Sequence, residues 1–407
     1  MNRQQQQAYV SFLREILEVT SESKGTPEVL YSRLQENLDK LDENLVQLLK
    51  EWATAKFAEV EPEEAESIAI GIGNFSNLIS QFSQGSRSKN LEIGITGYEV
   101  ILTVYTQQAF PTDWAMIQYN LGITYYDRIT GEKADNLERA ITCFQKALGV
   151  YTQQAFPTDW AMIQYNLGIA YYDRITGEKA DNLERAITCF QKALGVYTQQ
   201  AFSTDWAMTQ YNLGITYYDR ITGEKADNLE RAISCYQQAL GVYTQQAFPT
   251  DWAMTQYNLG NAYYDRIIGE KADNLERAIS CYQQALGVYT QQAFPTDWAM
   301  TQYNLGIAYY DRITGEKADN LERAISCYQQ ALGVYTQQAF PTDWAMTQYN
   351  LGIAYYDRIT GEKADNLERA ISCFQQALEV RTQQAFPQQW AMTQYNLGLA
   401  YKNRITG

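Results

Sequence analysis

The stretch Trp160–Asp205, WAMIQYNLGIAYYDRITGEKADNLERAITCFQKALGVYTQQAFSTD, recurs in near-copies along most of the chain. A tryptophan begins each copy, 46 residues after the last, at Trp114, Trp160, Trp206, Trp252, Trp298, Trp344 and Trp390. The copies that begin at Trp252 and Trp298 differ at two positions, Asn261/Ile307 and Ile268/Thr314. A fixed period of this size indicates stacked units that fold alike.

The first half of the unit has the apolar period of an α-helix, which we call helix A. One face collects Trp160, Gln164, Leu167, Gly168, Tyr171 and Ile175. Thr158 or Asp159, just after Pro157, is expected to cap the start of this helix, and Gly177 to stop it.

The second half predicts a helix B with an equally clear apolar face. This face comprises Leu183, Ala186, Ile187, Phe190, Ala193, Leu194 and Tyr197. Asp181 and Glu184 have the spacing of a capping box, and the helix is expected to end near Gln200, with Gly195 inside it to permit close helix approach. Two such helices cannot enclose a core alone, so each hairpin must stack on its neighbours.

The unit resembles a tetratricopeptide repeat. Leu167-Gly168, Tyr171, Ala186, Phe190 and Ala193 match the pattern of that family, although the family's usual repeat has about 34 residues. Two insertions of six residues account for the length of 46, and the result is similar to the long repeats of kinesin light chain. The resemblance implies an all-α, right-handed superhelical solenoid of helix hairpins, with helix A on the concave side.

Four segments follow from the repeat register. Residues 1–61 form an N-terminal helical segment, 62–111 a degenerate first repeat, 112–387 six full repeats and 388–407 a terminal half repeat that consists of helix A. Lys402 and Asn403 add polarity to this last helix, which favours an end cap. The alternative is that the sequence is a fragment of a longer protein in which helix B follows Gly407.

The N-terminal segment is predicted to form three helices, Arg3–Val19, Pro27–Leu38 behind a Thr26 cap, and Asn44–Val60. It is similar to the lead segments of bacterial repeat arrays associated with caspase-like (CHAT) protease or NTPase domains. Its small core is expected to contain Leu30, Leu34, Leu38, Leu41, Leu45, Leu48 and Leu49.

Composition excludes several classes of function. The chain of 407 residues has a formal net charge of −15, which argues against nucleic acid and anionic membrane as partners. It contains no histidine, so the usual general base is missing and we expect no enzyme, no cofactor and no metal. The six cysteines occur one per repeat and are expected to be buried apolar residues. With no secretory pattern or membrane-length apolar run, the chain is interpreted as cytoplasmic.

Helix A has a second stripe, which includes Tyr165, Asn166, Tyr172 and Asp173. The resemblance to tetratricopeptide repeats implies that this stripe lines the concave groove. Its asparagine resembles the asparagine ladder of kinesin light chain and of O-linked N-acetylglucosamine transferase, which implies that it binds a peptide backbone. A carboxamide offers both a donor and an acceptor for that purpose. The alternative is that each asparagine bonds to a neighbouring helix inside the fold. The ladder comprises Asn120, Asn166, Asn212, Asn258, Asn304, Asn350 and Asn396.

The tyrosine before each asparagine is expected to supply pockets for ligand side chains. These residues are Tyr119, Tyr165, Tyr211, Tyr257, Tyr303 and Tyr349. Asn261 replaces an Ile or Leu in the same groove and is expected to set the register of the ligand. The sequence thus predicts an interaction module that binds an extended peptide or a partner protein, as an adaptor or a sensor. The alternative is a scaffold that self-associates, with the chain either monomeric or weakly paired through its C-terminal helix.

Overall fold

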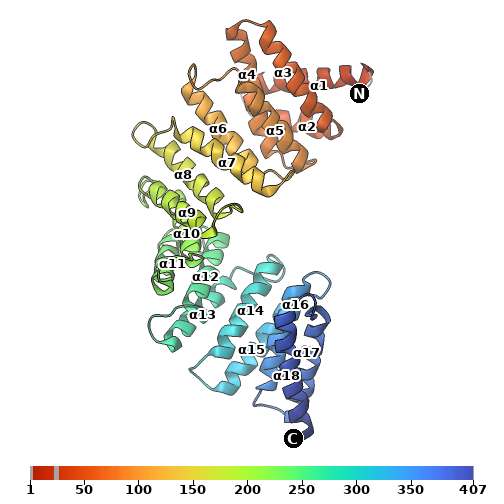
Figure 1. The fold of residues 1–407 in the computed structure, drawn as a ribbon, viewed down its shortest axis with the longest axis vertical. Coiled ribbons are helices and arrows are strands. Elements are labelled where there is room, and N and C mark those ends of the chain that lie inside the picture. The colour runs from red at the N-terminus through yellow and green to blue at the C-terminus, as the bar shows by residue number, and fades with distance from the viewer. Residues whose placement is uncertain (1–2, 23–26, 407) are drawn as a thin grey trace. The chain divides into compact units, whose positions relative to one another are not determined.

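The computed structural model describes residues 3–22 and 27–406, and all regular structure in those residues is helical (Figure 1). Residue contacts divide the chain into two compact units, Met1–Ala201 and Phe202–Gly407. The first unit begins with α1 (Arg3–Glu22), α2 (Pro27–Gln35), a short 3-10 turn at Leu38–Lys40 and α3 (Glu43–Glu59).

Helices of types A and B then alternate. The A helices are α4 (Pro62–Gln81), α6 (Pro111–Tyr126), α8 (Pro157–Tyr172), α10 (Ser203–Tyr218), α12 (Pro249–Tyr264), α14 (Pro295–Asp311), α16 (Pro341–Tyr356) and α18 (Pro387–Thr406). The B helices are α5 (Arg87–Ile101), α7 (Lys133–Leu148), α9 (Lys179–Leu194), α11 (Lys225–Leu240), α13 (Lys271–Ala285), α15 (Lys317–Ala331) and α17 (Lys363–Val380).

Within each unit, every A helix packs against the B helix that follows it, and that B helix packs against the next A helix. Successive A helices also touch, as α6 does with α8 in the first unit and α12 with α14 in the second. The A helices of a unit therefore lie side by side and form one surface, here called the A face. The all-α repeat fold predicted from the 46-residue period is confirmed.

Much of the core of each hairpin comes from residues that the helical period predicts. Leu167 and Tyr171 of α8 are buried, as are Ala186 and Phe190 of α9, whereas Ala161, which is also buried, is not part of the predicted face. The glycine of the Leu-Gly pair lets helix A lie close to helix B, because a Cβ atom on Gly168 would be only 2.7 Å from the Phe190 ring. This contact fixes the register of helix A on helix B.

The predicted ends of helix A are wrong. Helix α8 begins at Pro157, with Phe156 before it, and no side chain caps it. Proline suits this first position because it has no N–H to satisfy and its φ is already helical. The helix ends at Tyr172, and Gly177 instead lies in the following loop with φ +74°. Ile175 consequently falls beyond the helix and is 59% exposed.

The predicted ends of helix B are also wrong. Helix α9 begins at Lys179, so Asp181 lies in its first turn and makes no capping box with Glu184. It ends at Leu194 rather than near Gln200, and Gly195 is its C-cap rather than an interior residue. In the last repeat Glu379 replaces this glycine, and α17 continues to Val380. Glycine is a weak helix former, so its presence explains the earlier end in the other repeats.

The three predicted N-terminal helices are present, but α1 continues to Glu22 and α2 ends at Gln35, three residues before its predicted end. Thr26 lies outside the described residues. Leu38 is the exception in the predicted core, because it is 38% exposed in the short 3-10 turn. The rest of the predicted leucines are buried. Across residues 3–22 and 27–406, no helix combines the length and apolar character needed to cross a membrane.

Candidate functional site

The ladder asparagines lie on the A face, and most of them bond to a tyrosine of the preceding repeat. Asn258 Nδ2 donates to the Tyr211 hydroxyl at 2.8 Å. The same bond joins Asn166 to Tyr119 at 3.0 Å in the first unit, where Asn166 also donates to the Met162 carbonyl. In the second unit it recurs in the pairs Asn304–Tyr257, Asn350–Tyr303 and Asn396–Tyr349. The asparagine therefore does bond inside the fold, and its role in binding a peptide stays a prediction.

The tyrosines of these pairs are mostly enclosed. Tyr165, Tyr211, Tyr303 and Tyr349 are each below 10% exposed. Their rings contact an aromatic ring of the B helix in the same repeat, and Tyr211 lies 6.1 Å from Tyr236 between ring centroids. Burial raises the pKa of Tyr303 to about 12. These tyrosines join neighbouring repeats, and their role as pockets for ligand side chains stays a prediction.

A second row of tyrosine bonds runs along the C-terminal ends of the A helices. Tyr264 donates its hydroxyl hydrogen to Asp311 Oδ2 of the next A helix at 2.5 Å. The same contact joins Tyr126 to Asp173 in the first unit, and Tyr218 to Asp265 and Tyr310 to Asp357 in the second. Because each carboxylate accepts from a neutral phenol rather than a cation, the row keeps its negative charge.

Asn261 lies between the two helices of its repeat. Its Oδ1 accepts from the Tyr282 hydroxyl at 2.7 Å and from Asn304 Nδ2 at 3.2 Å. A polar cavity of about 220 Å³ opens beside it, with Tyr218, Asp265 and Ile307 among its lining residues. The sequence predicted a special position here, and the structure adds that Asn261 bonds to both its own B helix and the next A helix.

Asn120 differs from the rest of the ladder. The position 46 residues before Tyr119 is Gly73, so the tyrosine that bonds to most other ladder asparagines has no counterpart for Asn120. Its carboxamide instead lines a cavity of about 200 Å³ on the A face, together with Asn74 and Asn77. Asn77 occupies the same repeat position as Asn261. Sequence reasoning did not single out Asn77, although the 46-residue register relates the two asparagines.

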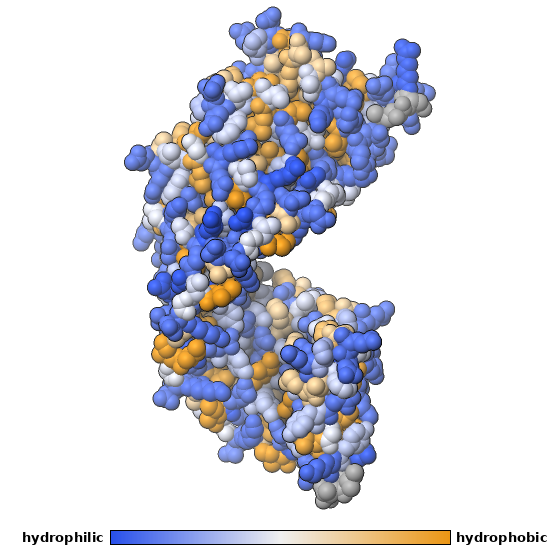
Figure 2. Space-filling view, viewed as in Figure 1, coloured by the Kyte–Doolittle hydropathy of each residue, from blue (hydrophilic) through white to orange (hydrophobic). Residues whose placement is uncertain are grey.

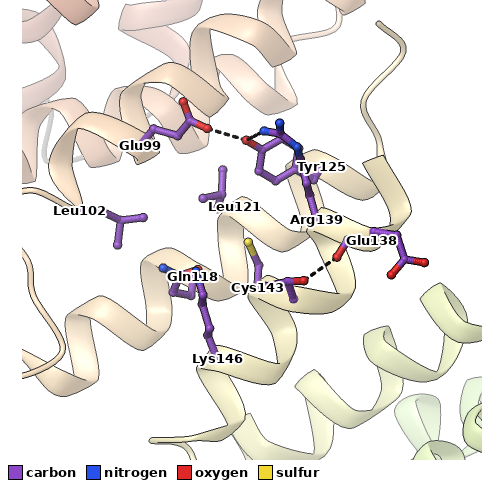
Figure 3. A pocket seen from close by; sticks show the side chains of 10 residues that line it. Glu99, Leu102, Gln118, Leu121, Tyr125, Glu138, Arg139, Cys143 and Lys146 are labelled. Atoms are coloured by element: carbon purple, nitrogen blue, oxygen red, sulfur yellow. Dashed lines mark hydrogen bonds between the residues drawn. The ribbon is translucent and has the colours of Figure 1, made fainter. Parts of the chain in front are cut away.

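A larger hollow of about 380 Å³ lies away from the ladder, where α5, α6 and α7 meet (Figure 3). Glu99 and Arg139 both point at the Tyr125 hydroxyl, which donates to Glu99 Oε1 at 2.5 Å and accepts from Arg139 Nη1 at 3.0 Å. In the following repeats a glutamine replaces Glu99, as Gln145 does when it donates to Tyr171 at 2.8 Å. This recurrence identifies the cluster as a junction between repeats.

The visible surface is mostly hydrophilic (Figure 2), and the cysteines are buried. Figure 2 shows hydrophilic residues over most of the visible surface, with apolar residues in small separate patches. All six cysteines are free and buried, and burial raises the pKa of the Cys143 thiol to about 11. In the part of the chain that the structure describes, no three His, Cys, Asp or Glu side chains are placed to hold a metal ion.

Two repeat families match parts of the chain. A tetratricopeptide repeat model matches residues 206–246 and 298–338, and the Sel1 repeat model matches residues 115–148, 161–194, 253–286 and 345–379. No curated protein matches the chain.

Solved structures resemble the chain at low sequence identity. The apo form of RapI is 14% identical with a TM-score of 0.51, and the match covers 89% of this chain and 97% of RapI. The C-terminal part of a TPR repeat-containing protein from Cytophaga hutchinsonii is 14% identical with a TM-score of 0.46, over 72% of this chain and 90% of that one.

A signal transduction ATPase with a tetratricopeptide repeat sensor, from Pyrococcus horikoshii, is also 14% identical, with a TM-score of 0.46. That match covers 100% of this chain and 53% of the ATPase. Repeats of the matched families form protein-interaction modules. The helix hairpins, their 46-residue period and the two family matches support a protein of tetratricopeptide-type repeats with an unusually long repeat.

Proposed function

We propose that the A face binds an extended segment of a protein partner, and that the chain acts as an adaptor or as the sensing part of a larger system. The observation that carries this proposal is the unused acceptor capacity of the ladder. Asn258 and Asn350 each spend an Nδ2 hydrogen on a tyrosine, and no donor among the described residues reaches either Oδ1 atom. Each oxygen is thus able to accept a backbone N–H of a bound peptide.

The bonds to the ladder would give only part of the affinity. A hydrogen bond contributes a net ~1 kcal/mol, and ordering an extended peptide opposes this gain. The carboxylates of Asp265, Asp311 and Asp357 form a negative row beside the ladder. This charge favours a basic or neutral segment over an acidic one. A cytoplasmic location, predicted from the sequence, would be compatible with such a partner.

The test begins with a random peptide library displayed on phage and selected on the immobilised full chain. Enriched peptides are then synthesised, and their affinity is measured for the wild type and for the variant N258A/N304A/N350A. We expect at least a tenfold loss of affinity, together with enrichment of Lys and Arg over Asp and Glu. Circular dichroism and thermal unfolding report whether the variant retains its fold.

The matched control is S234A/S280A/S326A, three alanine substitutions at exposed positions of the B helices. This control is expected to bind as the wild type does. If the asparagine variant retains both fold and affinity, the ladder has no part in binding. If it loses its fold, the asparagines serve the structure, and the peptide contacts must be sought elsewhere on the A face.

A self-associating scaffold is the second candidate, because α18 exposes an apolar surface. Met392 and Tyr395 are 55% and 68% exposed. A Cβ atom on Gly398 would meet nothing within 4 Å, whereas in the full repeats an aromatic ring of helix B closes this place. Asn403, expected to cap the array, bonds to Tyr356 of α16. Light scattering across a dilution series distinguishes a stable dimer, which favours the scaffold, from a monomer.

A further inference from the structure

The first junction of the array lacks a tyrosine that the other junctions have. In the full repeats a tyrosine such as Tyr119 lies between its own B helix and the asparagine of the next A helix, to which it bonds. Gly73 stands at this position in α4, so Asn120 has no such partner. The described residues provide no hydrogen bond to the carboxamide of Asn120 or to that of Asn74.

A second exchange accompanies the first. Ile101 of α5 stands where the full repeats have alanine, as at Ala147. A Cβ atom on Gly73 would lie 3.2 Å from Ile101 Cδ1, so the larger isoleucine fills part of the space that the tyrosine leaves. The compensation is incomplete, because a cavity of about 200 Å³ remains with Gly73, Ile101 and Asn120 in its wall.

The remaining cavity combines apolar and polar groups. Ile70 and Met116 are among its lining residues and are 51% and 48% exposed, so they offer apolar surface to a ligand. Tyr98 forms part of the wall at the position that Phe144 has in the next repeat. Its ring is buried, and its hydroxyl has no hydrogen-bond partner among the described residues. An adjoining cavity of about 200 Å³ shares Asn77, Tyr98 and Asn120.

We propose that this cavity receives a tyrosine side chain of the bound peptide, which takes the place of the tyrosine that the first repeat lacks. The ring would lie against Tyr98, as the Tyr119 ring lies 6.0 Å from Phe144. The hydroxyl would accept from Asn120 Nδ2, as the Tyr119 hydroxyl accepts from Asn166 at 3.0 Å. This inference rests on the proposed binding of a peptide to the A face and names one side chain of that peptide.

Other side chains fit the cavity less well. An aliphatic side chain, or phenylalanine, would fill apolar space but leave the carboxamide of Asn120 without a partner, which costs free energy. An acidic side chain would be repelled by the carboxylate of Asp113, which lines the cavity.

The experiment uses the full chain with ¹³C-labelled methionine methyl groups and three small probes. Met116 lines the cavity, and Met162 stands at the equivalent position one repeat later, where Tyr119 is present. N-acetyl-tyrosinamide is expected to shift the Met116 methyl resonance saturably and to leave that of Met162 unchanged. N-acetyl-phenylalaninamide is expected to bind at least fivefold more weakly, and N-acetyl-leucinamide more weakly again.

The decisive variant is G73Y/I101A, which recreates the Tyr119/Ala147 pair of the next repeat. It fills the cavity with the protein's own tyrosine, and the affinity for N-acetyl-tyrosinamide should fall at least tenfold. If this variant does not fold, N120A decides, because it should bring the affinities for the tyrosine and phenylalanine probes to within twofold of each other.

The proposal is overturned if the wild type binds the two aromatic probes equally, or if folded G73Y/I101A binds them as the wild type does. Peptides selected from the library separate this result from the proposed function. If they bind equally well to the wild type and to G73Y/I101A, the A face still binds peptides and the tyrosine pocket is wrong. If no peptide is selected while the probe still binds the wild type in the predicted order, the pocket stands and the A-face proposal loses its support.

Discussion

The Tyr282 hydroxyl donates to Asn261 Oδ1 across 2.7 Å, so the two helices of one repeat are joined by a bond that the neighbouring repeats lack. Tyr236 and Tyr328 occupy the position of Tyr282 in the repeats on either side, where Ile215 and Ile307 replace Asn261. For their hydroxyls, the part of the chain that the structure describes offers no hydrogen-bond partner. Three nearly identical repeats thus differ in whether one phenol is paired.

Tyr282→Phe should therefore destabilise the protein by about 1 kcal/mol, the usual net value of a hydrogen bond. Tyr328→Phe removes an unpaired hydroxyl and should change stability by less than that. The two variants are compared by the midpoints of their urea unfolding curves, measured by circular dichroism. Midpoints are used because a long repeat array need not unfold in two states. In an Asn261→Ile background the cost of Tyr282→Phe should disappear. Equal effects of the two substitutions in the wild-type background would contradict the assigned bond.

The sequence predicts the helices and the core well because both follow from local period. Leu167, Tyr171 and Phe190 are buried as expected, since any amphipathic hairpin of this pattern must bury that face. The helix ends were predicted less well. Asn182 donates to the Thr176 carbonyl at 2.8 Å and accepts from Arg174 Nη1 at 3.3 Å, so its side chain holds the loop between helices A and B. A capping rule applied to residues near the helix start does not include such a contact.

The sequence also predicts little about contacts within the candidate site, because these contacts join residues on different helices. The position of each ladder asparagine follows from the period. Its bond to the tyrosine of the preceding A helix, as between Asn166 and Tyr119, depends instead on how successive A helices pack. Gly73 illustrates this point. In the sequence it is one altered residue in a degenerate repeat, and its significance depends on Ile101 and Asn120, which lie on two other helices.

The cysteines are predicted to be unreactive in the folded protein. Burial raises the pKa of Cys189 to about 11 and that of Cys281 to about 12, so the thiolate that reacts is scarce at neutral pH. With Ellman's reagent at pH 7.5, we expect fewer than one thiol per chain to react within an hour. All six should react at once in guanidinium chloride. Rapid reaction of several thiols in buffer would show that helix B opens readily.

An ion pair between repeats predicts a dependence on pH. Arg312 Nε donates to Glu276 Oε1 at 2.7 Å, and this bond, with one from Thr314, lowers the pKa of Glu276 below 4.5. A carboxylate with a lowered pKa contributes stability above its unfolded pKa and loses that contribution as the pH falls through its folded pKa. Both side chains are partly exposed, so the contribution is below ~1 kcal/mol.

Glu276→Gln should therefore lower the thermal midpoint at pH 7, and the difference from the wild type should shrink as the pH falls through the lowered pKa of Glu276 and the wild-type carboxylate becomes protonated. Glu36→Gln is the control, because Glu36 pairs with Arg33 on an exposed surface. Its midpoint should match the wild type across the range. If the thermal midpoint of Glu276→Gln stays equally far below that of the wild type at the lowest pH, the loss comes from packing and not from charge.

Two equivalent glycines should respond oppositely to the same substitution. A Cβ atom on Gly352 of α16 would lie 2.7 Å from the Phe374 ring, whereas one on Gly398 of α18 meets no atom within 4 Å. Alanine improves a helix interior by about 1 kcal/mol over glycine, but overpacking a core costs about 1 to 3 kcal/mol. Gly398→Ala should therefore raise the urea midpoint, while Gly352→Ala should lower it, because the added methyl group must push α16 away from α17. If Gly352→Ala were stabilising as well, the close contact between helix A and helix B would not be the reason for glycine in the Leu-Gly pair.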